Sequence, residues 1–281
     1  MDKYSELIEN IISFGNRDDR IIAIVMVGSQ AREENAADQY SDLDLIMIVQ
    51  DTNYFVNANK WLSEIGKHHI SFLEKTIDGA DEKRVLFDGA LDVDFVILTE
   101  NDAKAALING DSQKMLCNGY RILVDKAGNK SLVPPQQLIR EPYVFPAEVV
   151  YVNVVNDFWY HAIWTSKKLL RGEFWAAKFC LDCNMKNKLL WMIEFYEHTR
   201  NESDYNTWYN GRFVDSWAGE DIKTLLADSF AHYEKQDMIS SLKKTMELFR
   251  HLAVCIAASV SYTYPMEADR YSSGWVDQNL A

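Results

Sequence analysis

Apolar residues recur along this chain with two different spacings, and the change of spacing divides it in two. In the first half, short runs of β-branched and aromatic residues between polar turns predict strands. The expected strands cover residues 21–27, 45–49, 69–73, 83–87, 90–98 and 120–124. Helical spacing also occurs there, over residues 4–14, over 100–106, and from Asp51-Thr52 to Gly66. The first half therefore predicts a sheet with flanking helices.

In the second half the apolar residues repeat every three to four positions, which is the spacing of amphipathic helices. The expected helices cover residues 149–170, 173–196, 221–233 and 238–262, and residues 204–213 are expected to be partly loop. Four of the five prolines fall within residues 125–148, which marks a linker or an extended crossover. We therefore expect an α+β fold with two domains, residues 1–135 and residues 136–281, the second a helical bundle.

The segment from Ile21 to Val49 carries the strongest chemical signal. An apolar run ends at Gly28-Ser29, a polar segment leads to Asp42 and Asp44, and a second apolar run follows at once. A glycine allows a tight turn, and the backbone N–H groups of such a turn suit a phosphate. Two carboxylates one residue apart at the start of a strand project from the same face.

Like charges this close repel each other unless a cation lies between them. A hard divalent ion such as Mg²⁺, held by a few carboxylates and by substrate phosphates, satisfies that requirement. The alternative is a Gly-Ser turn followed by two acidic helix caps. A second acidic pair, Asp92 and Asp94, lies in the apolar run 90–98, where a carboxylate is costly to bury without a cation or strong donors. Its alternative is an edge strand with a solvated acidic face.

Gly28-Ser29, followed after twelve residues by Asp42-Leu43-Asp44, resembles the signature of the polymerase-β-type nucleotidyltransferases. Within that superfamily, nearly the whole chain resembles the aminoglycoside 6-adenylyltransferases, the streptomycin-modifying group. Three further stretches support the resemblance, namely residues 14–20, Phe158-Trp159 and residues 188–193. The resemblance implies an N-terminal nucleotidyltransferase domain with a mixed β-sheet, followed by a helical acceptor-binding domain.

The resemblance also implies an ATP- and Mg²⁺-dependent transfer of AMP to a hydroxyl of streptomycin. Asp42 and Asp44 would bind the metal, and a third carboxylate from the neighbouring strand would complete the site or accept a proton. We assign that role to Asp94, with Asp92 as the alternative and a candidate for substrate binding. Gly28, Ser29 and Gln30 would hold the phosphates. The position of Gln30 is often arginine in the resembled group, but glutamine can still donate a hydrogen bond.

The helical half is expected to supply the acceptor pocket, because ligand sites favour domain interfaces. A polycationic acceptor requires carboxylates and aromatic faces. The candidate acceptor-binding residues are Asp157, Asp182 and Glu194, while Lys186 or Lys188 could contact the nucleotide phosphates. For each of these residues the alternative is a solvated helix face.

Composition and charge agree with this interpretation. The chain has 281 residues, 48% of them hydrophobic and 25% charged, and a net charge of −13. A strongly negative charge disfavours a nucleic-acid partner and attracts a small polycation. No apolar run is long enough to span a membrane, and residues 1–6 lack the pattern of a signal peptide, so we expect a cytoplasmic monomer or dimer without a membrane partner.

Other enzyme classes find no support in the sequence. Cys180 and Cys183 form a single CxxC within an apolar helical pattern, which favours core cysteines over a zinc or redox site. The six histidines show no metal-ligand spacing, and no serine lies in a GxSxG motif. Two alternatives stay open: an enzyme of the same chemistry with another acceptor, such as a lincosamide or a metabolite, and a nucleotide-binding module without turnover.

Overall fold

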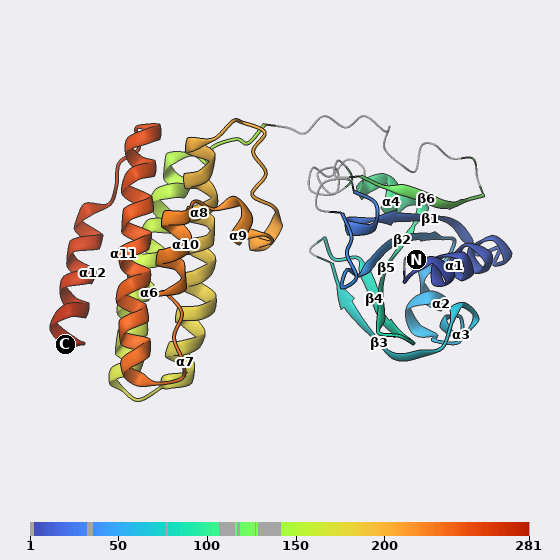
Figure 1. Ribbon diagram of the computed structural model, residues 1–281, viewed down its shortest axis with the longest axis horizontal. Coiled ribbons are helices and arrows are strands. Elements are labelled where there is room, and N and C mark those ends of the chain that lie inside the picture. The colour runs from blue at the N-terminus through green and yellow to red at the C-terminus, as the bar shows by residue number, and fades with distance from the viewer. Residues whose placement is uncertain are drawn as a thin grey trace. The chain divides into compact units, whose positions relative to one another are not determined.

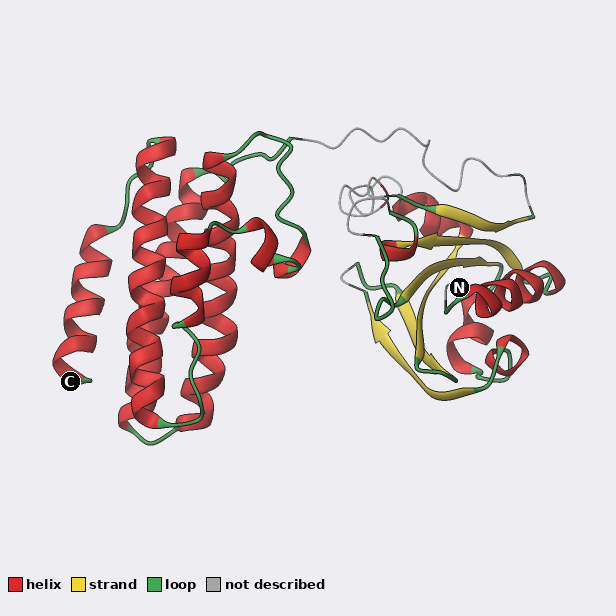
Figure 2. Cartoon of the chain, in the orientation of Figure 1, coloured by secondary structure: helices red, strands yellow, loops and turns green. Residues whose placement is uncertain are grey.

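The computed structural model describes residues 3–32, 36–76, 78–106, 116, 119–126, 128 and 142–280. The chain divides into two compact units, Met1–Arg140 and Glu141–Ala281. In the described ranges, the strands all belong to the first unit and the second consists of helices and loops (Figure 1, Figure 2). The boundary expected between residues 135 and 136 lies outside the described residues.

The first unit is built on a six-stranded sheet with the order β3-β4-β5-β2-β1-β6. The strands are β1 (Ile21–Val27), β2 (Leu43–Val49), β3 (His68–Lys75), β4 (Asp81–Phe87), β5 (Leu91–Thr99) and β6 (Arg121–Asp125). β2 and β5 run parallel, whereas every other neighbouring pair is antiparallel. This confirms the mixed sheet, and each predicted strand agrees with the structure to within two residues at either end.

In the described part of the chain, helices pack on both faces of the sheet. One face carries alternate apolar side chains such as Leu45 and Phe95, which pack against α1 (Ser5–Arg17), α2 (Thr52–Asn57) and α3 (Leu62–Ile65). On the other face, α4 (Glu100–Ala106) packs against Ile48 and Leu98. Since side chains alternate along a strand, Asp44 and Asp94 share the face of α4. They lie at the N-terminal ends of β2 and β5.

The single helix expected from Asp51 to Gly66 is wrong, because the structure divides it into α2 and α3. The interruption coincides with a lysine from a neighbouring strand: Lys83 Nζ donates to the Ala58 carbonyl oxygen (2.9 Å) and to Asn59 Oδ1 (2.8 Å). Lys83 is almost completely buried, so these acceptors satisfy an ammonium group that has little access to water. A contact from a distant part of the sequence thus stabilises the break between the two helices.

The second unit is a helical bundle, as expected. Its helices are α6 (Glu148–Leu170), α7 (Phe174–Phe179), α8 (Lys186–Arg200), α9 (Val214–Trp217), α10 (Glu220–Ala227), α11 (Lys235–Val260) and α12 (Met266–Asn279). The core is aromatic, and the rings of Phe158 and Phe249 stack with their centroids 3.6 Å apart. Arg250 on α11 donates two hydrogen bonds to Asp269 of α12, through Nε (2.7 Å) and Nη2 (2.5 Å). No helix in the described ranges is long and apolar enough to cross a membrane.

Three features of this unit differ from the predictions. The helix expected over 173–196 contains a π-helical segment, Cys180–Met185. A π-helix turns by a smaller angle per residue than an α-helix, and Cys183 is exposed instead of lying in the core with Cys180. α10 ends at Ala227, before a connector in which the Ser229 carbonyl oxygen accepts a hydrogen bond from Ser241 Oγ (2.5 Å). The polar tail forms α12, which the sequence did not predict.

Candidate active site

Three carboxylates converge at one end of the sheet. Asp42, Asp44 and Asp94 each offer an oxygen, and these oxygens all lie within 4.8 Å of one another. The parallel pairing of β2 with β5 places Asp44 directly beside Asp94. Because both side chains point from the same face, the register of the two strands brings them together, as expected from the sequence. We refer to Asp42, Asp44 and Asp94 as the carboxylate triad.

The structure distinguishes between the two acidic residues of β5. Asp94 is only 8% exposed and belongs to the triad, whereas Asp92 is exposed. The Tyr4 hydroxyl lies 3.1 Å from Asp92 Oδ1 and 3.0 Å from its carbonyl oxygen, so it can donate to this residue. β5 lies inside the sheet, between β4 and β2. The alternative of an edge strand with a solvated acidic face is therefore wrong.

Burial dominates the electrostatics of Asp94. Removal from water raises the pKa of this carboxyl to about 6, and the negative charges of Glu82, Asp42 and Asp92 act in the same direction. The Arg84 guanidinium opposes the shift. Arg84 lies opposite Asp94 on the neighbouring strand β4, and its Nη1 is 3.6 Å from Asp94 Oδ2. A site that concentrates negative charge in this way suits a divalent cation.

Gly28 is adapted to the carboxylate that lies against it. Its φ is +68°, a conformation that favours glycine, and a Cβ added there would come within 1.9 Å of Asp44 Oδ2. Asp44 itself lies in β2 and begins no helix, so the alternative of two acidic helix caps is wrong. The glycine turn thus lies directly against the carboxylate triad, in contact with Asp44.

Ser29 and Gln30 complete the turn, which is a short 3₁₀ helix, Gly28–Gln30. Ser29 is 9% exposed, and its Oγ is buried without a hydrogen-bond partner in the described part of the chain. A buried hydroxyl without a partner is uncommon and calls for an explanation, such as an ion, a water molecule or a ligand. A phosphate oxygen beside the triad would supply the acceptor. Gln30 is half-buried at the end of the turn.

Arg84 is the residue of this site that the sequence reasoning missed. Its Nε lies 2.9 Å from Glu74 Oε2 and its Nη2 lies 3.5 Å from Glu82 Oε2, in addition to the contact with Asp94. Glu74 and Glu82 are directly opposite each other on β3 and β4. The alternation of polar and apolar residues in β4 placed Arg84 on one face of a strand, but it did not show which strand would lie beside it.

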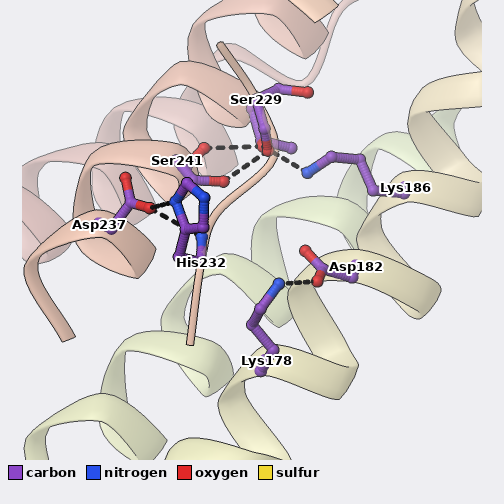
Figure 3. Close-up of polar contacts among 8 residues, drawn as sticks. Lys178, Asp182, Lys186, Ser229, His232, Asp237 and Ser241 are labelled. Carbon is purple, nitrogen blue, oxygen red and sulfur yellow. Dashed lines mark hydrogen bonds and ion pairs between the residues drawn. The ribbon is translucent and has the colours of Figure 1, made fainter. Parts of the chain in front are cut away.

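Lys186 lies within the helical unit, with its partners on α11. Its Nζ donates to Thr245 Oγ1 (2.8 Å), and the side chain is 7% exposed. Figure 3 shows Lys186 pointing from α8 toward the polar groups of Ser229 and Ser241. Burial lowers the pKa of Lys186 to about 8. Asp182 forms an ion pair with Lys178 in the same region (Figure 3).

Asp157 and Lys188 also have partners within the helical unit. Asp157 contacts Lys188 Nζ (3.2 Å) and His161 Nδ1 (2.6 Å), and Lys188 Nζ donates to Asn184 Oδ1 (2.6 Å). Lys186 and Lys188 would therefore have to exchange partners in order to bind a nucleotide. The same holds for Asp157 and a cationic ligand.

Glu194 on α8 differs from the other acidic candidates. It has no ion-pair or hydrogen-bond partner among the described residues, and burial raises the pKa of its carboxyl to about 7. Tyr143 lies close enough for the charge of Glu194 to raise the pKa of its phenol, along with burial, to about 12. Tyr143 stacks on His198 with ring centroids 3.6 Å apart. A partly buried carboxylate beside aromatic rings suits a cationic ligand.

Comparison with known proteins decides the family. The family model described as streptomycin adenylyltransferase matches residues 1–278. The chain belongs to this family. An aminoglycoside 6-adenylyltransferase from Campylobacter jejuni is 24% identical over 277 residues, covering 95% of this chain and 93% of the relative. The enzyme of that name from Bacillus subtilis is 21% identical over 271 residues, covering 92% of each chain.

The crystal structure of an aminoglycoside 6-adenyltransferase from Bacillus subtilis aligns over 99% of both chains, with a TM-score of 0.46 and 17% identity. The assignment rests on the sequence match to the family, which extends over both units. As a member of the streptomycin adenylyltransferase family, the chain is an adenylyltransferase, a nucleotidyltransferase enzyme. The resemblance inferred from Gly28-Ser29 and Asp42-Leu43-Asp44 is confirmed at the level of the family.

Proposed function

We propose that this enzyme transfers AMP from ATP to the 6-hydroxyl of streptomycin in a Mg²⁺-dependent reaction, and that it thereby confers resistance to this antibiotic in the cytoplasm. The observation that carries the proposal is the carboxylate triad, joined to the turn of Gly28 and Ser29 in a chain of this family. The first unit would act as the nucleotidyltransferase domain and the second as the acceptor-binding domain.

The donor set fits Mg²⁺. Asp42, Asp44 and Asp94 offer only carboxylate oxygens, the ligands that this ion prefers, and they leave positions for phosphate oxygens and water. When bound, the ion would neutralise charge on the triphosphate and fix its geometry. Ser29 Oγ, which lacks a partner within the described ranges, would donate a hydrogen bond to a phosphate oxygen, with Gln30 beside it.

The reaction joins the acceptor oxygen to the α-phosphorus while the bond from that phosphorus to the pyrophosphate oxygen breaks. The hydroxyl proton leaves to a base, and Asp94, the carboxylate of the triad on β5, is proposed for this task. A base at this position contributes on the order of 10² to 10⁴ in rate. Asp42 and Asp44 would hold the metal in the same reaction, and Asp92, the other carboxylate of β5, is proposed to contact the acceptor.

Recognition of the acceptor would depend on carboxylates of the helical unit. Streptomycin is a polycation, and Glu194 is the candidate there with no cationic partner among the described residues. Asp157 and Asp182 are proposed as secondary contacts, since each already pairs with a lysine. Lys186 and Lys188 are proposed to contact the nucleotide after exchange of their present partners.

Mass spectrometry of streptomycin after incubation with the enzyme, ATP and Mg²⁺ tests the proposal. The expected result is a gain of mass equal to one AMP residue, absent with Asp42→Asn. Asp88→Asn is the matched control, because Asp88 is an exposed aspartate of the same unit, paired with His69 (2.8 Å).

Other outcomes assign other functions. Pyrophosphate release with a lincosamide or a metabolite, but not with streptomycin, would retain the chemistry and replace the acceptor. ATP binding without turnover across a broad panel of acceptors would indicate a nucleotide-binding module.

A further inference from the structure

Arg84 brings a fixed positive charge to the edge of the carboxylate triad. Its Nη1 lies 3.6 Å from Asp94 Oδ2, a separation at which two charges interact strongly without a short hydrogen bond. The side chain of Asp94 is 11% exposed, so solvent screens this charge pair less than a surface pair. In the protein without a metal, Arg84 therefore supplies part of the positive charge that the triad requires.

Two further carboxylates form ion pairs with the guanidinium. Arg84 Nε lies 2.9 Å from Glu74 Oε2 on β3, and Nη2 lies 3.5 Å from Glu82 Oε2 on its own strand. The guanidinium of Arg84 therefore contacts carboxylates on three neighbouring strands: Glu74 on β3, Glu82 on β4 and Asp94 on β5. These two ion pairs favour a guanidinium that stays beside Asp94 when a second cation approaches.

We propose that Arg84 is a positioning residue that competes with the catalytic metal for Asp94 and sets the affinity of the triad for the free ion. The inference rests on the proposed metal site. A divalent ion at the triad would be repelled by Arg84, whereas a metal–nucleotide complex, with its net negative charge, would not. Arg84 therefore favours loading of the metal together with the triphosphate over binding of the free ion.

The test is the affinity of the purified full-length protein for Mn²⁺, measured by electron paramagnetic resonance without nucleotide. Arg84→Gln is expected to bind free Mn²⁺ about tenfold more tightly than the wild-type protein, because one repulsive charge is removed. Arg84→Lys retains the charge and is expected to bind like the wild type. Neither substitution is expected to tighten the binding of a Mn²⁺ complex with a non-hydrolysable ATP analogue.

Arg20 offers a matched control in the same unit. It pairs with Asp18, its side chain is 43% exposed against 42% for Arg84, and it precedes β1, at the end of that strand remote from Gly28. Arg20→Gln removes the same charge and is expected to leave the Mn²⁺ affinity unchanged. A tighter Mn²⁺ affinity of Arg84→Gln cannot result from damage to the fold, since damage would weaken the site.

The remaining outcomes separate the inference from the proposed function. Unchanged or weaker Mn²⁺ binding by Arg84→Gln, with a wild-type site that Asp42→Asn abolishes, would overturn the role of Arg84 alone. A wild-type protein that binds no Mn²⁺ sensitive to Asp42→Asn, with or without the ATP analogue, would overturn the proposed metal site and with it this inference.

Discussion

The carboxylate of Asp44 occupies the space that a side chain at position 28 would need. A Cβ on Gly28 would lie 1.9 Å from Asp44 Oδ2, and the backbone there has a φ of +68°. The Gly28–Gln30 turn and β2 can therefore approach each other this closely only because residue 28 is glycine. The signature pairs Gly28 with the second aspartate for a steric reason as well as a chemical one.

Gly28→Ala is expected to abolish turnover, because the added methyl group must displace the Asp44 carboxylate or the turn. Gly79→Ala is the matched control, since Gly79 also has a positive φ, +85°, but a Cβ there would meet no atom within 4 Å. Both substitutions are expected to cost about 1 to 2 kcal/mol of stability through backbone strain. Thermal unfolding and AMP-transfer assays measure the two effects. Full activity of Gly28→Ala would contradict the steric argument.

Ser29→Ala is expected to separate substrate binding from stability. The Ser29 hydroxyl is buried without a partner in the described part of the chain, so removing it leaves the free energy of unfolding unchanged or slightly higher. If the hydroxyl donates to a phosphate, the KM for ATP should rise by about ten- to hundredfold, the equivalent of a lost hydrogen bond to a charged group. An unchanged KM together with a lower melting temperature would show a structural role instead.

Glu194→Gln is expected to stabilise the protein in a pH-dependent manner. The pKa of this carboxyl is about 7 in the folded protein and 4.5 in its ordinary state. Below about pH 4.5 the Glu194 carboxyl is protonated in both the folded and the unfolded state, so the substitution has no effect on the free energy of unfolding. Between pH 4.5 and pH 7 the carboxyl keeps its proton in the folded state but loses it in the unfolded state. The stability of the wild-type protein therefore falls as the pH rises, and the total loss above pH 7 is at most about 3 kcal/mol.

Chemical denaturation of the wild-type protein and Glu194→Gln at pH 5 and pH 8 measures this difference. Glu247→Gln is the control, because Glu247 is an exposed glutamate of α11 whose replacement should change little at either pH. If Glu194 binds a cationic group of the acceptor, Glu194→Gln should also raise the KM for streptomycin without changing the KM for ATP. An equal gain of stability at both pH values would contradict the burial of an ionised carboxylate.

The sequence predicts the parts of this structure that depend on local pattern. Asp42 and Asp44 stand at the start of an apolar run, so strand alternation places both on one face without knowledge of the neighbours. The choice between Asp92 and Asp94 is different, because it depends on the register of β5 against β2. Arg84 was missed for the same reason, since its partners lie on two other strands.

Helix boundaries that depend on contacts between distant residues could not be predicted from the sequence either. The interruption between α2 and α3 coincides with two hydrogen bonds from Lys83, a residue of β4. α12 carries few apolar residues, and the ion pair between Arg250 and Asp269 joins it to α11 in addition to the packing of Val276. The apolar spacing that predicted α6 and α11 does not predict such contacts between residues far apart in the sequence.

Asp269→Asn is expected to destabilise the helical unit by about 3 kcal/mol. The side chain of Asp269 is 3% exposed and accepts hydrogen bonds from Arg250 and from the Tyr264 hydroxyl (2.7 Å). Replacing a buried carboxylate leaves its cationic partner uncompensated. Denaturant titration monitored by tryptophan fluorescence measures the loss, and Asp277→Asn, at an exposed position of the same helix, is the control. Equal stabilities for the two variants would contradict a stabilising role of the buried ion pair between Asp269 and Arg250.

The parallel pairing of β2 with β5 has a consequence for the order in which this protein gains activity. Asp44 and Asp94 meet only when β2 has paired with β5, and the two strands are separated in the sequence by α2, α3, β3 and β4, because a parallel partner cannot be reached through a tight turn. Contacts between residues far apart in the sequence form slowly. During refolding from denaturant, helical circular dichroism should therefore recover before Mn²⁺ binding does. The carboxylate triad forms only when β5 has joined β2, so a nascent chain cannot assemble it before residue 94 has emerged from the ribosome.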